Sequence, residues 1–249
     1  MQKLLFKTSF HSFGNSGLRV ALLFAFLFAT MRAVAMLGES SYKPLLPASF
    51  VLMALLPFIF LTRNGRATIG MTKATSPKYY VIALLYGALA ASICFGIGYL
   101  LFGTGPDNWF MSILKFYQRN PGISDMPRSQ LFIIFTIPAM IFSPIGEEIF
   151  FRGFLQDAMT ERFNVQISIV LESLLFGVVH IFHHGLIRTS LGIEFYPGSA
   201  LLWILLMFGT AYGFAMMRKY SASLWPAMTA HAAFNIVMNF FIFFVLYPT

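Results

Sequence analysis

Two adjacent carboxylates and an arginine lie inside an otherwise apolar stretch of the sequence. Glu147, Glu148 and Arg152 follow the apolar run 131–142 and are interleaved with isoleucine and phenylalanine. Ionisable side chains at membrane depth are costly and mark a functional site by default. Glu148 and Arg152 are four residues apart and can pair on one helix face, whereas Glu147 points about 100° away and is expected to be unpaired. An unpaired carboxylate at depth suits a general base. The alternative is an ion pair that only ties two helices together.

The residues just before the carboxylates predict the start of a helix. Ser143 can cap the N-terminus of a helix, and Pro144 suits its first position, where the missing N–H costs nothing. Glu147 and Glu148 would then lie early in that helix, where its dipole favours negative charge.

Two further pairs of residues with chemical potential lie in later apolar runs. Phe176 and His180 are four apart, as are His231 and Asn235, so each pair shares a helix face. A lone buried histidine is more often a satisfied core residue than a catalyst. At ~1.5 Å per residue from the inner helix ends, these polar groups and Glu147 all lie near the middle of a ~30 Å apolar core. We therefore expect one shared site built from three helices.

Other polar residues carry weaker predictions. Glu172 is expected to pair with Arg152 or to line the cavity, in a supporting role. Arg32 is expected to snorkel toward the interface. His183 and His184 lie at a helix end, where interfacial histidines are ordinary.

The composition is that of a membrane protein. Charged residues make up 10% of the 249 and hydrophobic residues 58%, with a mean hydropathy of +0.74, whereas a soluble domain carries about a quarter charged residues. The net charge of +8 does not predict nucleic-acid binding, because the basic residues lie in short loops where they set topology. The single cysteine, Cys94, excludes an internal disulfide and cysteine-based metal chemistry.

The apolar runs predict an all-α polytopic membrane protein, a bundle of about seven (six to eight) transmembrane helices in a single membrane domain over residues 1–249. The third run is rich in glycine and alanine, which predicts a central helix. The longest loop, 103–129, is predicted to hold a short interfacial helix over 109–117, and residues 184–198 are predicted to form a loop. The predicted spans are 20–37, 44–61, 79–102, 130–143, 165–183, 200–217 and 224–247, with the fourth running on into a helix that ends near residue 163.

The loop charges predict that the N-terminus lies inside. Ala33-Val34-Ala35 resembles a signal-peptidase site, but Arg32 directly before it is unfavourable, and a retained first helix is favoured. The basic residues then fall mainly on the inside. The inside group is Lys3, Lys7, Arg19, Arg63, Arg66, Lys73, Lys78, Arg162, Arg218 and Lys219, and the outside group is Lys43, Lys115, Arg119, Arg128 and Arg188.

Together the three polar stretches resemble the CAAX protease and bacteriocin-processing family (CPBP, also called Abi) of intramembrane endopeptidases. The family pattern is EExxxR, FxxxH and HxxxN on separate membrane helices. The matching residues here, in order, are Glu147-Glu148 with Arg152, Phe176 with His180, and His231 with Asn235, flanked by Pro144-Ile145-Gly146 and Leu224-Trp225-Pro226. The resemblance covers a core of about 131–240, and the N-terminal half carries no matching motif.

The resemblance implies hydrolysis of a peptide bond in a membrane-associated protein or peptide, prenylated or not. Glu147 with His180 would activate a water, and His231 and Asn235 would stabilise the oxyanion. The supporting residues would be Glu148, Arg152 and Phe176.

The family has also been described as zinc metalloproteases, and zinc would then be held by Glu147, His180 and His231. The metal-free glutamate mechanism is favoured, because neither HExxH nor another fixed ligand pair is present. One alternative is a non-catalytic scaffold or partner-sequestering protein of the same fold. Another is a small-solute transporter, against which stands the lack of inverted repeats. The short loops and the absence of organelle-type extensions predict a bacterial cytoplasmic membrane protein whose partners are the lipid bilayer and a peptide, not nucleic acid.

Overall fold

The computed structural model describes residues 5–10, 17–120, 122–123 and 126–247. Within these ranges seven helical segments are long and apolar enough to cross a membrane. The prediction of an all-α polytopic membrane protein is confirmed. The seven segments are 17–37, 40–60, 78–102, 128–159, 165–182, 197–221 and 224–246.

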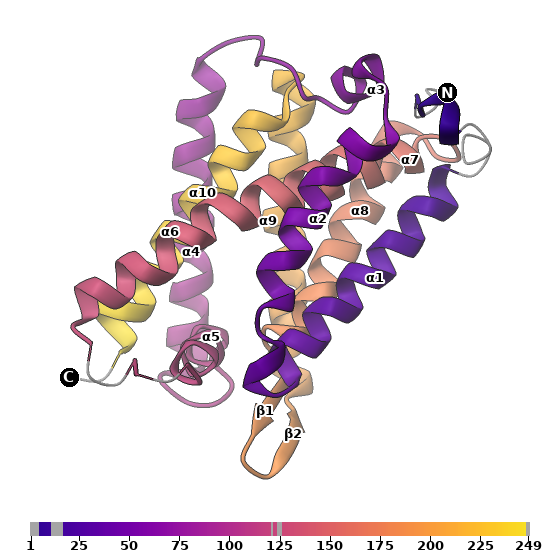
Figure 1. Cartoon of the computed structure of the whole chain (residues 1–249). Coiled ribbons are helices and arrows are strands. Elements are labelled where there is room, and N and C mark those ends of the chain that lie inside the picture. The colour runs from indigo at the N-terminus through magenta and orange to yellow at the C-terminus, as the bar shows by residue number, and fades with distance from the viewer. Residues whose placement is uncertain (1–4, 11–16, 121, 124–125, 248–249) are drawn as a thin grey trace.

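The helices follow one another with short connections (Figure 1). The N-terminal half contains α1 (Gly17–Leu37), η2 (Ser40–Tyr42), α2 (Leu45–Phe60), α3 (Arg63–Thr68), α4 (Lys78–Phe102) and α5 (Trp109–Gln118). The C-terminal half contains α6 (Arg128–Glu147), the π-helical segment η3 (Glu148–Leu155), α7 (Gln156–Met159), α8 (Val165–Val179), η4 (His180–Phe182), α9 (Pro197–Ser221), α10 (Leu224–Phe241) and η5 (Ile242–Leu246).

One loop prediction is confirmed, one is wrong, and one span differs in length. The short helix predicted over 109–117 is present as α5, and the Asn108 side chain caps it by accepting the N–H of Phe110 at 2.9 Å. The loop predicted over 184–198 instead contains a hairpin of β1 (Leu186–Thr189) and β2 (Gly192–Phe195), paired antiparallel. The sixth span is longer than predicted, because α9 continues through Ser221.

The prediction that a helix begins at Ser143 is wrong. Helix α6 runs without a break through Pro138 and Pro144 and ends at Glu147. The Ser143 hydroxyl bonds the Glu147 side chain at 2.9 Å instead of capping a backbone N–H. Proline inside a helix removes a backbone hydrogen bond, but membrane helices tolerate it where neighbouring groups satisfy the freed carbonyl. Glu147 therefore lies inside the continuous helical stretch 128–159, where α6 passes into η3, and the dipole argument for an early position does not apply.

The bundle is centred on α10 rather than on α4. In the spanning window of α10, 56% of the residues are buried, against 28% for α4, so the prediction that the third span is central is wrong. The small residues of α4 allow close approaches, because a Cβ on Gly87 would collide with the backbone carbonyl of Ala230 on α10 and one on Gly98 with the Trp109 ring on α5. The other face of α4 carries exposed leucines.

The molecule has two distinct ends (Figure 1). The N-terminus, α3 and α7 lie at one end, and α5 and the β1–β2 hairpin lie at the other. Of the basic residues predicted to lie inside, Lys3 is outside the described residues, and the rest belong to segments at or near the N-terminal end. Which end faces the cytoplasm stays a prediction.

Candidate active site

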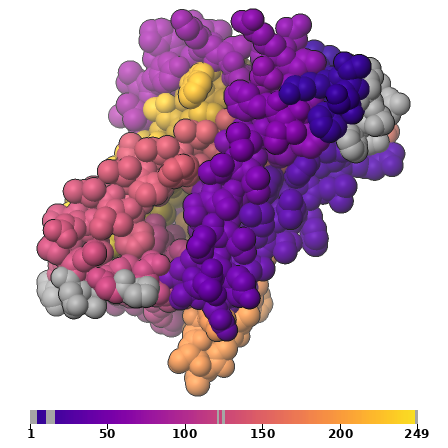
Figure 2. Space-filling view, in the orientation of Figure 1, coloured from indigo at the N-terminus to yellow at the C-terminus, as the bar shows by residue number. Residues whose placement is uncertain are grey.

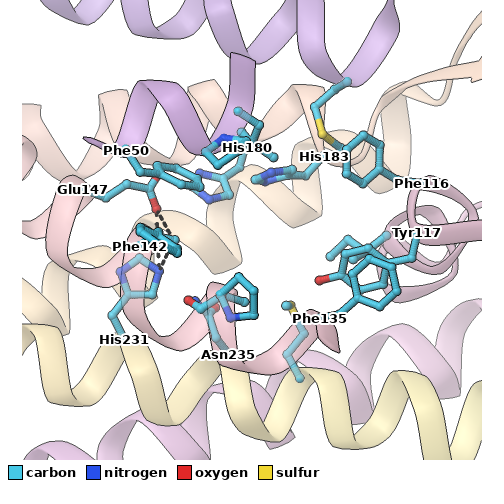
Figure 3. A pocket seen from close by; sticks show the side chains of 18 of the residues that line it. Phe50, Phe116, Tyr117, Phe135, Phe142, Glu147, His180, His183, His231 and Asn235 are labelled. Carbon is cyan, nitrogen blue, oxygen red and sulfur yellow. Dashed lines mark hydrogen bonds and ion pairs between the residues drawn. The ribbon is translucent and has the colours of Figure 1, made fainter. Parts of the chain in front are cut away.

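A cavity of about 560 Å³ lies between α2, α6, the α8–η4 junction, α9 and α10. Figure 2 shows a hollow between α2 and α6, with part of α10 visible within it. Most of the cavity wall is apolar and aromatic, and Glu147, His231 and Asn235 lie near one another on one side of it (Figure 3). The lining also includes the polar residues Ser40, Lys43, Tyr117 and Asn120. The aromatic lining includes Phe50, Phe116, Phe135, Phe142, Trp203 and Phe214.

The four residues predicted to act in catalysis all line this cavity. Glu147 is the last residue of α6, His180 is the first residue of η4, and His231 and Asn235 lie one turn apart on α10. Their exposed fractions are 1%, 6%, 5% and 7% in that order, so water reaches them only through the cavity. Three helices thus bring carboxylate, imidazole and amide groups to one layer of the bundle.

Glu147 is not unpaired, contrary to the prediction. Its Oε1 accepts a hydrogen bond from Nη2 of Arg32, which lies on α1. Its Oε2 accepts from the Ser143 hydroxyl at 2.9 Å and lies 3.6 Å from Nε2 of His231. Arg32 is only 2% exposed, so the prediction that it snorkels is wrong as well. A guanidinium that pairs with a buried carboxylate is stabilised at depth and does not have to extend to the interface.

Glu148 forms hydrogen bonds with both Arg152 and His231. Its Oε1 accepts from Nη1 of Arg152 at 3.2 Å, which confirms the pair predicted from the four-residue spacing, and from Nδ1 of His231 at 2.7 Å. Nε of Arg152 lies 3.5 Å from Oε1 of Glu172, so the predicted Glu172–Arg152 pairing is confirmed. The Arg152 guanidinium also lies over the Phe176 ring, 4.1 Å from its centroid. Such contacts attract a cation to the face of the ring and add to the ion pairs.

His180 has a defined tautomer. Its Nδ1 lies 2.6 Å from the backbone carbonyl of Phe176, one turn earlier. A carbonyl oxygen only accepts hydrogen bonds, so Nδ1 carries the proton and donates it. In the neutral ring, Nε2 then holds a lone pair, and His180 lines the cavity.

The Asn235 side chain links α10 to α6 by one hydrogen bond and has a second amide N–H available. Its Nδ2 donates to the carbonyl of Ala139 at 2.8 Å. The amide nitrogen carries two hydrogens, so one N–H is left for a further acceptor. One turn along α10, Asn239 donates to the Thr136 hydroxyl of α6 at 3.2 Å and holds the same helix pair together.

The sequence reasoning missed three residues of this site. Arg32 is the single charged residue between Val20 and Leu37, and a charge within a predicted span was a usable signal. Ser143 was assigned to a helix cap. His183 lines the cavity, with its ring centroid 4.9 Å from that of His180, and nothing in its spacing distinguished it.

His184, the neighbour of His183, has a structural position away from the cavity. Its Nδ1 lies 2.8 Å from the Ser112 hydroxyl of α5 and its Nε2 2.9 Å from the Ser199 hydroxyl of α9. Burial lowers the pKa of His184 to about 4, so the ring is neutral near pH 7. It holds α5 against α9 beside the far end of the cavity.

The candidate zinc ligands offer one carboxylate oxygen and two imidazole nitrogens. Within the described ranges, no three His, Cys, Asp or Glu side chains are grouped so that they could hold a metal ion. The Arg32 guanidinium on Oε1 of Glu147 also puts a positive charge where a divalent cation would have to bind.

Comparison with known proteins gives two matches. Residues 129–237 match the family model described as "Type II CAAX prenyl endopeptidase Rce1-like". The chain is also 29% identical over 147 residues to a Bacillus subtilis (strain 168) protein named "Putative membrane peptidase YdiL", and this alignment spans 57% of the chain and 54% of that relative. The comparison with solved structures gave no significant match. The matched segment contains the first two polar motifs and His231 with Asn235, so the resemblance to the CAAX protease family is confirmed. Arg32 lies outside it.

Proposed function

We propose, from the similarity of residues 129–237 to type II CAAX prenyl endopeptidases, that this chain is an intramembrane endopeptidase. It would hydrolyse a peptide bond of a membrane-associated protein or peptide. The observation that carries the proposal is that Glu147, His180, His231 and Asn235 all line one cavity. In this proposal each of them has a chemical task.

Glu147 and His180 are suited to activate water. The lone pair on Nε2 of His180 accepts one hydrogen of a water, and Oε2 of Glu147 takes the other as a proton while the water oxygen attacks the carbonyl carbon of the peptide. Oε2 is the carboxylate oxygen assigned to this task, because Oε1 is bound by Arg32. A general base must lie within hydrogen-bond reach of the proton that it takes, typically about 2.6–3.2 Å.

Asn235 and His231 are suited to hold the oxyanion. The second N–H of Asn235 and the Nε2–H of a protonated His231 can donate to the oxygen that becomes negative. Glu148, which accepts from Nδ1 at 2.7 Å, compensates the charge of that imidazolium. When the C–N bond breaks, the proton held by Glu147 passes to the leaving nitrogen, and the products are a carboxylic acid and an amine. One oxyanion donor is typically worth about 10²–10³ in rate.

The metal-free mechanism is the version that we propose. The donor set fits zinc poorly, because Glu147 already shares its charge with the Arg32 guanidinium and a second cation beside it would be repelled. No step above requires a metal ion.

The cavity wall supports an apolar, membrane-associated substrate. A volume of about 560 Å³ is in the range of ligand pockets, and a largely apolar and aromatic wall with a few polar groups favours an apolar chain. The assay compares cleavage of matched farnesylated and unmodified peptides, which tests whether the substrate must be prenylated.

The test uses the protein reconstituted in liposomes with those two peptides. Glu147→Gln keeps the size of the side chain but cannot take a proton, and cleavage should fall by at least about 10²-fold, the low end for acid–base catalysis. His180→Ala should fall similarly, and Asn235→Ala should keep a residual rate. The matched control is Asp157→Asn, because Asp157 pairs with Arg218 at 2.5 Å and does not line the cavity.

Chelation separates the two mechanisms. Exhaustive treatment with a strong chelator should leave the rate unchanged. Loss of activity that zinc restores, with about one zinc per chain by elemental analysis, would replace the metal-free mechanism by the zinc one. Cleavage that survives Glu147→Gln unchanged would remove Glu147 from both. A folded protein that cleaves neither peptide, nor any of a wider set of membrane-anchored peptides, would favour the scaffold alternative.

A further inference from the structure

One part of the site comes from outside the segment that matches the endopeptidase family. Arg32 belongs to α1, which lies at one edge of the bundle in Figure 1 and has one face exposed. Its apolar positions Leu23 and Phe26 are 70% and 74% exposed. Arg32 lies on the buried face of α1 among apolar residues, and this long cationic side chain is 2% exposed and pairs with the last residue of α6.

Burial of Arg32 is expensive and therefore informative. A guanidinium inside a membrane protein costs several kcal/mol of desolvation, which an ion pair recovers only in part. In the part of the chain that the structure describes, Nη1 of Arg32 has no hydrogen-bond partner, so even this pairing is incomplete. A helix that only had to pack would be better served by methionine or leucine at this position.

The contact selects one oxygen of the carboxylate. Nη2 of Arg32 binds Oε1 of Glu147, whereas Oε2 is turned toward the Ser143 hydroxyl and Nε2 of His231. The orientation of the carboxylate is therefore set from two sides, by α1 and by the preceding turn of α6.

Both ends of α1 are tied down, which fixes the position of Arg32 along the helix axis. At the C-terminal end Arg119 donates to the carbonyls of Met36 and Gly38 at 2.7 and 2.6 Å, and Arg188 donates to the carbonyl of Leu37 at 2.9 Å. At the N-terminal end the backbone N–H of Leu18 donates to Oε2 of Glu161 at 3.3 Å. Basic side chains at the C-terminus of a helix also complement its dipole.

We propose that Arg32 is a positioning residue of the peptidase site: it holds Oε1 of Glu147 so that Oε2 is the oxygen that accepts the proton of the attacking water. This inference rests on the proposed function. It makes α1, a peripheral helix with no matching motif, a necessary part of the catalytic unit.

The first experiment measures turnover of the reconstituted protein. Arg32→Met should lower kcat by about 10²-fold with little change in KM, because a misplaced base impairs the chemical step more than binding. Arg32→Lys, which keeps the charge, should recover at least a tenth of the parent rate. Methylguanidinium added to Arg32→Ala should raise its rate. The control is again Asp157→Asn, which breaks a different charged pair that does not line the cavity, and it should stay within about threefold of the parent.

The second experiment is a double-mutant cycle in thermal unfolding, which needs no peptidase activity. Arg32→Met and Glu147→Gln should each lower Tm in detergent, because each strands a buried partner. The double variant should be more stable than the sum of the two losses predicts.

The outcomes separate the two claims. An additive cycle, or an Arg32→Met variant with the parent kcat, overturns the role of Arg32 while leaving the peptidase proposal in place. If the cycle shows coupling but Arg32→Met keeps the parent kcat, the pair is structural only, which also overturns the positioning role of Arg32. A parent protein without peptidase activity overturns the proposed function, and the positioning role falls with it, whatever the cycle gives for the pair.

Discussion

Arg152 lies at the centre of a buried cluster of charged side chains and contacts two carboxylates. It lies 3.2 Å from Glu148 and 3.5 Å from Glu172, and all three side chains are fully buried. Two carboxylates share one guanidinium, and Nδ1 of His231 contributes a further donor to Glu148. The positions of Glu148 and His231 therefore depend on Arg152, although Arg152 itself does not line the cavity.

Removal of Arg152 should destabilise the fold as well as the site. Arg152→Ala leaves two buried carboxylates without their cation, and a broken buried pair typically costs about 3–5 kcal/mol. The expected result is a clear drop in Tm in detergent, together with loss of cleavage. Arg218→Ala is the comparison, because its pair with Asp157 is partly exposed and should contribute less. Equal Tm values for the two variants and the parent would make the Arg152 cluster incidental.

Spacing predicted the local pairs and missed the distant one. Glu148 with Arg152 lies within one helical stretch, where four residues bring side chains to one face. Glu147 with Arg32 spans 115 positions, and only the packing of α1 against η3, which begins directly after Glu147, brings these two together. The expectation of an unpaired Glu147 considered partners on its own helix and no others. The catalytic roles themselves stay predictions.

The crossing of α2 over α6 is the element-level contact that places Glu147. Gly146 lies directly before Glu147, and a Cβ there would collide with the backbone of Phe50 on α2. The two helices approach this closely because Gly146 has no side chain, as in other small-residue contacts between membrane helices.

Gly146→Ala should therefore push α2 away from α6. We expect a lower Tm and a lower kcat, because Glu147 moves with the helix end and a misplacement of about 1 Å can cost 10²-fold. Gly96→Ala on α4 is the matched control, because a Cβ there meets no described atom within 4 Å and alanine is the better helix former. If both variants behave like the parent, the close approach at Gly146 does not position the site.

Long elements were predictable and their interruptions were not. An apolar run of about 20 residues has few alternatives to a spanning helix. A serine followed by proline is compatible both with a helix start and with a proline inside a membrane helix. Here Pro144 lies inside α6, and the Ser143 hydroxyl donates to the Glu147 side chain instead of capping a helix. The β1–β2 hairpin has only four residues in each strand, too few for a clear alternation of polar and apolar positions.

At the scale of the whole molecule, the two ends of the bundle should lie on opposite sides of the membrane. Thr75 precedes α4 at the N-terminal end and Ser190 lies in the hairpin at the other, and both are exposed. Three spanning segments separate them. In a Cys94→Ser background, Thr75→Cys should label from the cytoplasm and Ser190→Cys from outside. Labelling of both from one side would contradict the spans between them, and labelling with the sides exchanged would reverse the predicted orientation.

The π-helical geometry of η3 also limits how the length of this part of the chain can change. A π-helix bonds residues five apart, one more than an α-helix. Deletion of a single residue between Ile149 and Phe151 would remove the surplus residue of the wide turn, and relaxation to α-helical pitch would leave the following residues close to their present faces. An insertion has no such compensation and would turn everything after it by about 100° relative to Glu148. Every side chain of η3 is buried, so that rotation would carry Arg152 away from both of its carboxylates. Insertions should therefore be as poorly tolerated here as substitutions of the charged residues themselves, and a single deletion should be tolerated better.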